Sequence, residues 1–272
     1  MKFDMGQAWN SATELLGKNK DVILVVAGMF IFLPNLALSL LIPGLDQPQV
    51  NPEDTDAVFE AFREMYQEYW WALLISTLVQ TVGTLSLLTL LTDNSRPTVA
   101  EAIKLGGKGL LPYVGTQILL GFGVAIVIGL PLGIAVASQI VPLVAIIGLV
   151  SVVAVIYILI KTLLITPVIA IERIYNPVAI FKRSWSLTKG NSFRLFAFFA
   201  LLVIAVSVLF LIVNGILAVV LAAVGGQVQI IGTAVVSGIF NTIFAIVILA
   251  VLAGIHRQLA GPTAEDVSDT FS

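Results

Sequence analysis

Long apolar runs, separated by short polar segments, dominate the pattern of residues along this chain. As helices, six of these runs are long enough to cross ~30 Å of hydrocarbon, and they cover about 22–43, 69–92, 110–136, 142–171, 195–224 and 228–255. The third contains Gly129-Leu-Pro-Leu-Gly133, which should break the helix. A count of five or seven spans would require splitting or merging clear apolar runs. The pattern therefore predicts an all-α, polytopic membrane protein with six transmembrane helices.

Composition supports this class and excludes others. The 272 residues are 58% hydrophobic and 11% charged, whereas soluble domains are about 25% charged. The net charge of −2 is divided among the loops rather than pooled on a basic face, so nothing favours a nucleic-acid partner. There is no cysteine, which excludes disulfides and thiolate chemistry.

The positions of the basic residues predict an orientation. If the N-terminus is cytosolic, twelve Lys and Arg residues fall in cytosolic segments and Arg63 falls outside. Cytosolic loops carry such an excess of positive charge. We therefore expect a multi-pass protein of a bacterial inner membrane with both termini in the cytosol.

The outer segment 44–68 carries seven acids. One interpretation is a site for a cation or a partner. The other is a solvated helix start, in which Asn51 caps the helix, Pro52 takes its first position and the acids favour the positive end of the helix dipole. An apolar stripe would then lead to the interfacial pair Trp70-Trp71, and it consists of Val58, Phe59, Phe62, Met65 and Tyr66.

A short amphipathic segment precedes the first, third and fifth spans. The first two carry capping boxes, Ser11…Glu14 and Thr98…Glu101, and the third opens with Asn176-Pro177. Each should lie in the membrane interface and stop at a Gly-, Lys- and Asn-containing turn. This predicts a single membrane domain, 1–272, built as a pseudo-threefold repeat of interfacial helix plus hairpin, with units at about 5–92, 96–171 and 176–256 and a polar cytosolic tail at 257–272.

The third amphipathic segment, with the sequence FKRSWSLTKGN at 181–191, is the best developed. On a helical wheel its cations and Ser186 fall on one half, and the other half carries Ile180, Phe181, Ser184, Trp185, Leu187 and Thr188. This pattern suits a helix lying among lipid headgroups, with the cations toward phosphates and the other half toward acyl chains. The alternatives are positive-inside anchoring without a ligand, a lipid-headgroup site and a partner-docking surface. The candidate residues for lipid or partner binding are Lys182, Arg183, Trp185, Lys189 and Asn191.

Lys161 is the one formal charge inside a predicted span, and charges at such depth usually face protein or water. Pro167 frees the Leu163 carbonyl, so Lys161 could bond to that oxygen or to an Asn or Gln of another span. It could instead bind substrate or lipid phosphate, or extend toward Glu172 and the interface. The candidate intramembrane polar site comprises Lys161, Pro167, Glu172, Gln80 and Thr84.

Span two carries a stripe of polar residues, namely Thr77, Gln80, Thr81, Thr84, Ser86 and Thr89. One interpretation is hydrogen bonding between helices, each bond contributing about 0.6 kcal/mol. The other is a polar path between the repeats.

The stretch KTLLITPVIAIERIYNPVAIFKRSWSLTKGN at 161–191 resembles the signature of bacterial inner-membrane proteins related to the membrane domain of glycerophosphoryl diester phosphodiesterases, the YciC-like group. The matching positions are Lys161, Pro167, Glu172, Pro177, Arg183, Ser184, Trp185, Leu187, Thr188, Lys189, Gly190 and Asn191. The basic position is often Arg in such proteins, so Lys161 departs from the pattern. The resemblance implies an inner-membrane protein of unassigned activity.

We expect no enzyme, because phosphodiester hydrolysis requires metal ligands and an acid–base pair, and the single histidine, His256, stands beside Arg257 without a cluster of acids. No cofactor or metal is expected. The leading hypothesis is a non-enzymatic membrane protein that engages anionic lipid, or a cytosolic or membrane protein partner, through its interfacial helices. The alternative is a transporter or flippase of a small amphiphile that uses the polar site around Lys161.

Overall fold

The computed structural model describes residues 2–18, 20–42, 45, 54–93, 95 and 97–261. These residues form helices and short turns, and no strand occurs among them. Six helical stretches are long and apolar enough to cross a membrane: Lys20–Leu41, Asp56–Thr92, Val99–Ala137, Val141–Ala170, Ser192–Leu221 and Gly226–Ala260. The predicted all-α polytopic fold with six spans is confirmed.

The helices follow one another in simple chain order. They are α1 (Met5–Lys18), α2 (Lys20–Ala27), α3 (Leu33–Leu41), α4 (Thr55–Thr92), α5 (Val99–Val124), α6 (Leu130–Ala137), α7 (Val141–Thr162), α8 (Ile165–Ala170), α9 (Pro177–Leu187), α10 (Ser192–Val224) and α11 (Gly226–Ala260). Two π-helical stretches, Gly28–Phe32 and Ala125–Gly129, join α2 to α3 and α5 to α6.

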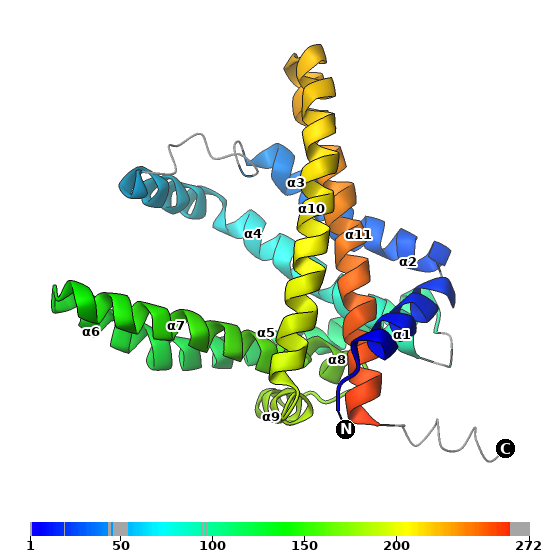
Figure 1. The fold of residues 1–272 in the computed structure, drawn as a ribbon. Coiled ribbons are helices and arrows are strands. Elements are labelled where there is room, and N and C mark those ends of the chain that lie inside the picture. Colours follow the sequence, from blue (N-terminus) through cyan, green and yellow to red (C-terminus); the bar gives the residue numbers. More distant parts are fainter. Residues whose placement is uncertain are drawn as a thin grey trace.

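Three hairpins diverge from a common end of the molecule (Figure 1). The common end, called the base from here on, comprises α1, α8, α9, the last turns of α4, α7 and α11 and the first turns of α5 and α10. The arms are the remaining parts of the hairpins, in which α6 packs on α7 and α10 packs on α11. In the described chain, α1 and the C-terminal end of α11 both lie at the base (Figure 1).

The hydrophobic core lies in and next to the base. Its fully buried side chains include Leu85, Leu87, Leu88, Val168, Ile169, Ile180, Leu195, Val251 and Ile255, which come from α4, α8, α9, α10 and α11. Helix α1 approaches α11 so closely that a Cβ on Gly254 would lie 2.8 Å from the Ala8 carbonyl oxygen. The base is therefore held by protein–protein packing.

Proline changes the first and third spans in the same way. Pro34 and Pro131 each stand second in a helix that directly follows a π-helical stretch, and a leucine precedes each of them. The wider π turn accommodates a residue that cannot donate a backbone hydrogen bond. The predicted break at 129–133 is thus wrong, because the chain stays helical from Val99 to Ala137.

The predictions for the first two interfacial helices are only partly confirmed. The first helix begins at Met5, where the Asp4 carboxylate accepts a hydrogen bond from the Gln7 amide at 2.8 Å. Ser11 and Glu14 therefore lie inside α1, and the predicted capping box there is wrong. The Thr98–Glu101 capping box is confirmed, but α5 continues through Gly107-Lys108 without a stop. The second unit consequently has no separate interfacial helix.

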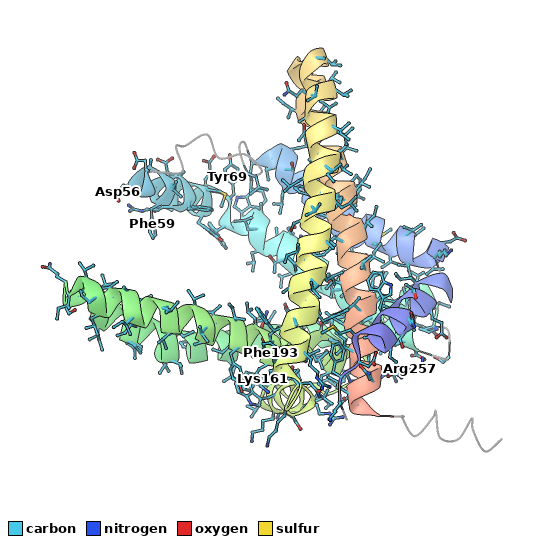
Figure 2. The ribbon with its side chains drawn as sticks, in the orientation of Figure 1. Asp56, Phe59, Tyr69, Lys161, Phe193 and Arg257 are labelled. Atoms are coloured by element: carbon cyan, nitrogen blue, oxygen red, sulfur yellow. The ribbon has the colours of Figure 1, made fainter. Side chains whose placement is uncertain are left out.

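The long helix of the second span begins after the predicted point. Its N-cap is Asp54, whose carboxylate accepts from the Ala57 amide at 3.1 Å. Asn51-Pro52, the predicted cap, and the tail beyond residue 261 lie outside the described residues. Phe59, Tyr66 and Trp70 are exposed on α4, and Phe59, in its first turns, lies far from the base (Figure 2).

Candidate functional site

Local sequence signals define α9, the helix nearest the candidate site. The Asn176 side chain accepts hydrogen bonds from the Val178 and Ala179 amides at 3.0 and 3.1 Å, and Pro177 takes the first helical position. The helix ends at Leu187, and Gly190 follows with φ 81°, a left-handed conformation that favours glycine. The predicted start and stop of this helix are confirmed.

The buried face of α9 packs on protein. Ile180, Ser184 and Leu187 are buried, and the Ser184 hydroxyl donates to the Lys161 carbonyl oxygen at 2.8 Å. The prediction that this half of the helix faces acyl chains is therefore wrong for these residues. The helical wheel separates the two faces of α9, but it does not indicate whether protein or lipid covers the apolar face.

The opposite face of α9 is exposed. It carries Lys182 and Ser186, and Lys189 is exposed in the turn that follows the helix. Phe181 and Trp185 stand at its edge, half-buried, with ring centroids 5.5 Å apart. The first turn of α10 then presents Phe193, which is 81% exposed (Figure 2). Cations and an apolar ring thus share one surface.

Arg183 is not part of that free surface. Its Nε donates to both Glu172 carboxylate oxygens, at 3.0 and 2.8 Å. His256 Nε2 lies 2.8 Å from Glu172 Oε1, and because a carboxylate has only acceptors, this nitrogen carries the hydrogen. The three residues join α9, the turn before it and the end of α11.

The electrostatics of Glu172 follow from this geometry. Burial raises the pKa of its carboxyl, but the hydrogen bonds and charges of His256 and Arg183 outweigh burial and lower the pKa from 4.5 to about 2. Nearby, Arg173 adopts φ 53° and pairs with Asp93 at 3.0 Å. These two ion pairs fix the turn that precedes α9 to its neighbours.

Lys161 lies at the end of α7, beside α9 (Figure 2). The helix stops at Thr162, and α8 begins at Ile165 with Pro167 as its third residue, so the predicted fourth span contains a short turn. The Lys161 ammonium stands 5.4 Å from the Tyr157 ring centroid and 5.6 Å from that of Trp185. Among the described residues its ammonium makes no hydrogen bond to a freed carbonyl, Asn or Gln, so the contacts give no support to that alternative.

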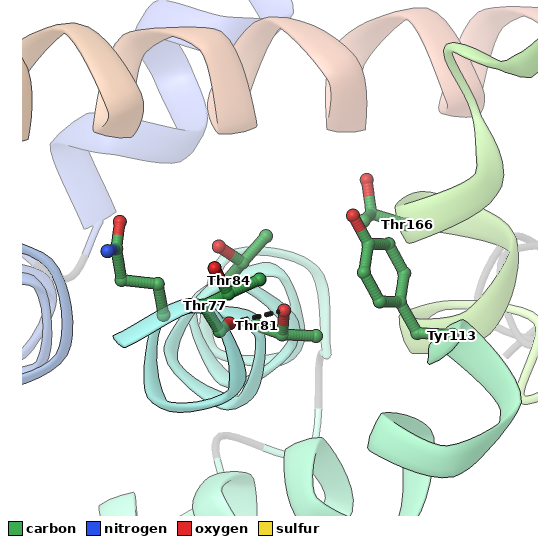
Figure 3. Close-up of a pocket in the computed structure, with 6 residues that line it drawn as sticks. Thr77, Thr81, Thr84, Tyr113 and Thr166 are labelled. Carbon is green, nitrogen blue, oxygen red and sulfur yellow. Dashed lines mark hydrogen bonds between the residues drawn. The ribbon is translucent and has the colours of Figure 1, made fainter. Parts of the chain in front are cut away.

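Gln80 and Thr84 lie elsewhere. They line a pocket of about 220 Å³ together with Thr77, Thr81, Tyr113 and Thr166 (Figure 3). Lys161, Pro167 and Glu172 do not line this pocket, so the residues grouped as one intramembrane polar site fall into two places.

Four hydroxyls of the polar stripe bond within α4. They donate to backbone carbonyls one turn earlier, as in Thr77 to Leu73, Thr81 to Thr77, Ser86 to Val82 and Thr89 to Leu85. The predicted bonds between helices are wrong for these four side chains. Such bonds satisfy a hydroxyl inside the membrane without a second helix.

Asn191, a predicted lipid contact, is buried. Its side-chain oxygen accepts from the Phe3 amide at 2.9 Å, and Arg194 donates to the Phe3 carbonyl at 3.4 Å. Phe3 packs on Phe198. Asn191 therefore fixes the segment before α1 to the start of α10.

Sequence reasoning missed Tyr157 and His256 as members of these clusters. Tyr157 stands four residues before Lys161, a spacing that places both on one helix face, so it could have been found. His256 is 84 residues from Glu172, and no local signal joins them. In the described residues no group of three His, Asp or Glu side chains could hold a metal.

Comparisons with protein-family models, with curated proteins and with solved structures found no match. The resemblance of 161–191 to the YciC-like group accordingly remains a prediction.

Proposed function

We propose that this protein is a non-enzymatic component of a bacterial inner membrane whose base engages anionic lipid headgroups in the cytosolic leaflet. The observation that carries the proposal is the exposed face of α9. Lys182 is exposed there and Lys189 is exposed in the turn that follows, while the other side of the helix is hydrogen-bonded and packed into the base.

Charge pairing favours a ligand for these two lysines. The Glu172 carboxylate, which contacts α9 through Arg183, is already engaged by Arg183 and His256, and no ion pair of Lys182 or Lys189 occurs among the described residues. Each lysine near an anionic leaflet contributes roughly 1 kcal/mol. The exposed Phe193 ring supplies the apolar contact that interfacial segments use.

The distribution of basic residues supports the cytosolic side. Among the described residues, Lys104, Lys182, Arg194 and Arg257 stand on the parts of α5, α9, α10 and α11 that form the base, whereas Arg63 lies in the first turns of α4 at the other end. The positive-inside rule assigns such a side to the cytosol, where the leaflet is negatively charged.

The test is lipid enrichment. The full chain is purified in detergent from mixed bilayers of phosphatidylglycerol and phosphatidylcholine, and the lipids retained are quantified. We expect phosphatidylglycerol to be enriched, and the double variant K182Q/K189Q to reduce the enrichment by roughly a factor of five per lysine.

The matched control is R63Q, which removes one exposed charge from the opposite end of α4, where Arg63 pairs weakly with Glu60 at 3.6 Å. It should leave the enrichment unchanged. Equal retention of both lipids by the wild-type protein, or equal effects of the α9 and Arg63 variants, would refute the proposal.

The alternative, a transporter or flippase of a small amphiphile, has one favourable observation, the polar pocket beside α4. It requires a route that joins this pocket to Lys161. Because Lys161 does not line the pocket, lipid binding at the base is the better-supported function.

A further inference from the structure

The Lys161 side chain is buried, and among the described residues its ammonium contacts aromatic rings rather than hydrogen-bond acceptors. The residue is 97% buried, since 3% of its surface is exposed. Its ammonium faces the rings of Tyr157 and Trp185 at 5.4 and 5.6 Å, and these two rings contact each other edge to face with centroids 5.7 Å apart. The two rings therefore form an aromatic corner that holds a cation.

Aromatic rings do not satisfy the hydrogen-bond donors of an ammonium. A lysine has three N–H donors, and no oxygen acceptor for Lys161 Nζ occurs among the described residues. A buried charge without such partners is costly, and cation–π contacts offset only part of that cost. An oxygen-rich anion would supply the missing acceptors.

The electrostatic surroundings favour an anion. Lys189 follows Trp185 by four residues, in the turn after α9, and it is exposed, while the Trp185 ring lies 5.6 Å from the Lys161 ammonium. The Glu172 carboxylate, the acid nearest in sequence, is held by Arg183 and His256. Two cations thus act on the same region, and the closest acid is engaged elsewhere.

The Lys161 ammonium also remains accessible. In the described chain, the fully enclosed side-chain polar atom that lacks a partner is Gln258 Oε1, and not Lys161 Nζ. The small exposed area of Lys161 therefore includes its ammonium. It lies where α7 ends against α9, at the base rather than along an arm (Figure 2).

We propose that Lys161 and Lys189 together bind the phosphate of a phosphomonoester lipid such as phosphatidic acid, with Trp185 beside the bound headgroup. A monoester phosphate carries nearly two negative charges and three acceptor oxygens, which match two ammonium groups, whereas a diester headgroup carries one charge. This inference rests on the proposed function, because it assigns a preferred ligand to the same basic surface.

Trp185 provides the reporter. The chain has four tryptophans, so the variant W9F/W70F/W71F retains only Trp185, whose ring lies 5.6 Å from the Lys161 ammonium. The protein is reconstituted in phosphatidylcholine bilayers that contain brominated phosphatidic acid, brominated phosphatidylglycerol or brominated phosphatidylcholine. Quenching of Trp185 gives the relative affinity of each lipid.

We expect phosphatidic acid to bind at least about tenfold more tightly than phosphatidylglycerol, because hydrogen bonds to charged groups are the strong ones. K161Q should bring that ratio close to one, and K161R should preserve it. K182Q, on the same helix as the reporter, should weaken both anionic lipids equally and leave the ratio unchanged.

A second variant covers the case in which K161Q is destabilised. If K161Q lowers the thermal stability, K189Q serves as the second variant, since Lys189 is exposed. It should reduce the ratio by roughly fivefold, because a headgroup with nearly two charges loses about twice the free energy that a diester loses when this lysine is removed. Competition with inorganic phosphate and with glycerol 3-phosphate distinguishes a soluble phosphate from a lipid. Displacement at millimolar concentrations would assign the phosphate site to a soluble ligand, and its absence supports the lipid.

The outcomes separate the two proposals. If both anionic lipids bind no better than phosphatidylcholine, the proposed function fails and this inference fails with it. If phosphatidylglycerol exceeds phosphatidylcholine but equals phosphatidic acid, or if K161Q leaves the ratio unchanged, the inference alone is overturned.

Discussion

The base and the arms of this molecule are both apolar, but different contacts cover their side chains. At the base, Leu85, Leu88 and Val251 are enclosed by other helices. Along the arms, Leu149, Leu211 and Val219 are 70%, 69% and 73% exposed. In a bilayer, lipid chains are as apolar as these side chains. The base is thus stabilised by packing, and the arms by an apolar solvent.

Polar bonds follow the same division. In the arms, Thr77 and Asn214 donate to carbonyls of their own helices. At the base, bonds join segments far apart in sequence, such as Phe3 to Asn191 and His256 to Glu172. Tertiary specificity is therefore concentrated at the base, where the candidate site lies, and matched substitutions in the two regions should have unequal effects.

The largest difference is expected for leucine truncation. Leu88→Ala at the base should lower the free energy of unfolding by about 2–5 kcal/mol, because it leaves a cavity among enclosed side chains. Leu149→Ala, on the lipid-facing side of α7, should cost less than about 1 kcal/mol. SDS-driven unfolding in mixed micelles measures both, and equal costs would contradict the division.

A smaller effect is expected where α5 packs against α4. A Cβ on Gly106 would lie 2.7 Å from the Val82 carbonyl oxygen and nearer still to Ser86 Oγ, whereas one on the adjacent Gly107 meets nothing within 4 Å. Gly106→Ala should therefore destabilise by about 1–3 kcal/mol. Gly107→Ala should be neutral or stabilise by up to about 1 kcal/mol. The same unfolding assay decides, and a destabilised Gly107 variant would show that the helices pack differently.

The ion pairs of Glu172 with Arg183 and His256 should contribute less to the free energy of unfolding than these packing contacts. Glu172→Gln leaves Arg183 and His256 without their carboxylate and should cost about 2 kcal/mol. Glu60→Gln, which removes an exposed carboxylate at the other end of α4, should cost no more than about 0.5 kcal/mol. Thermal unfolding followed by circular dichroism compares the two variants, and an equal, small cost would mean that the cluster does not hold the base.

The same carboxylate predicts a pH dependence. Its pKa is about 2 in the folded protein against 4.5 for the unfolded chain, so its stabilising contribution is fully present above about pH 5. That contribution is lost as the pH falls from 4.5 toward 2, because protonation then favours the unfolded state. Unfolding of the wild-type protein should weaken across this window, and Glu172→Gln should flatten the dependence; parallel curves would refute the assignment.

The sequence predicted what short-range physics controls. Six spans follow from apolar length, and the Asn176 and Thr98 caps follow from residues within one helical turn. The predicted cap at Ser11 was wrong because Asp4 caps the helix, which therefore begins before Ser11. The stop at Gly107-Lys108 failed because its neighbour Gly106 packs directly on α4, and tertiary packing overrides glycine's weak helix propensity.

The candidate site could be predicted only in part. Lys161, Glu172 and Arg183 were identified as important residues, but their partners were not. Glu172 meets Arg183 and His256 across 11 and 84 residues, and a pattern read along the chain does not specify such contacts. The helical wheel of α9 likewise separated polar from apolar faces without distinguishing protein from lipid as the apolar neighbour.

The account depends on the base lying at the cytosolic leaflet, and sidedness tests this most directly. Because the chain has no cysteine, the single variants S186C, on the exposed face of α9, and R63C, at the far end of α4, each carry one thiol. A membrane-impermeant maleimide should label R63C but not S186C in spheroplasts, and S186C but not R63C in inverted membrane vesicles. Labelling of S186C from the outside would contradict the account.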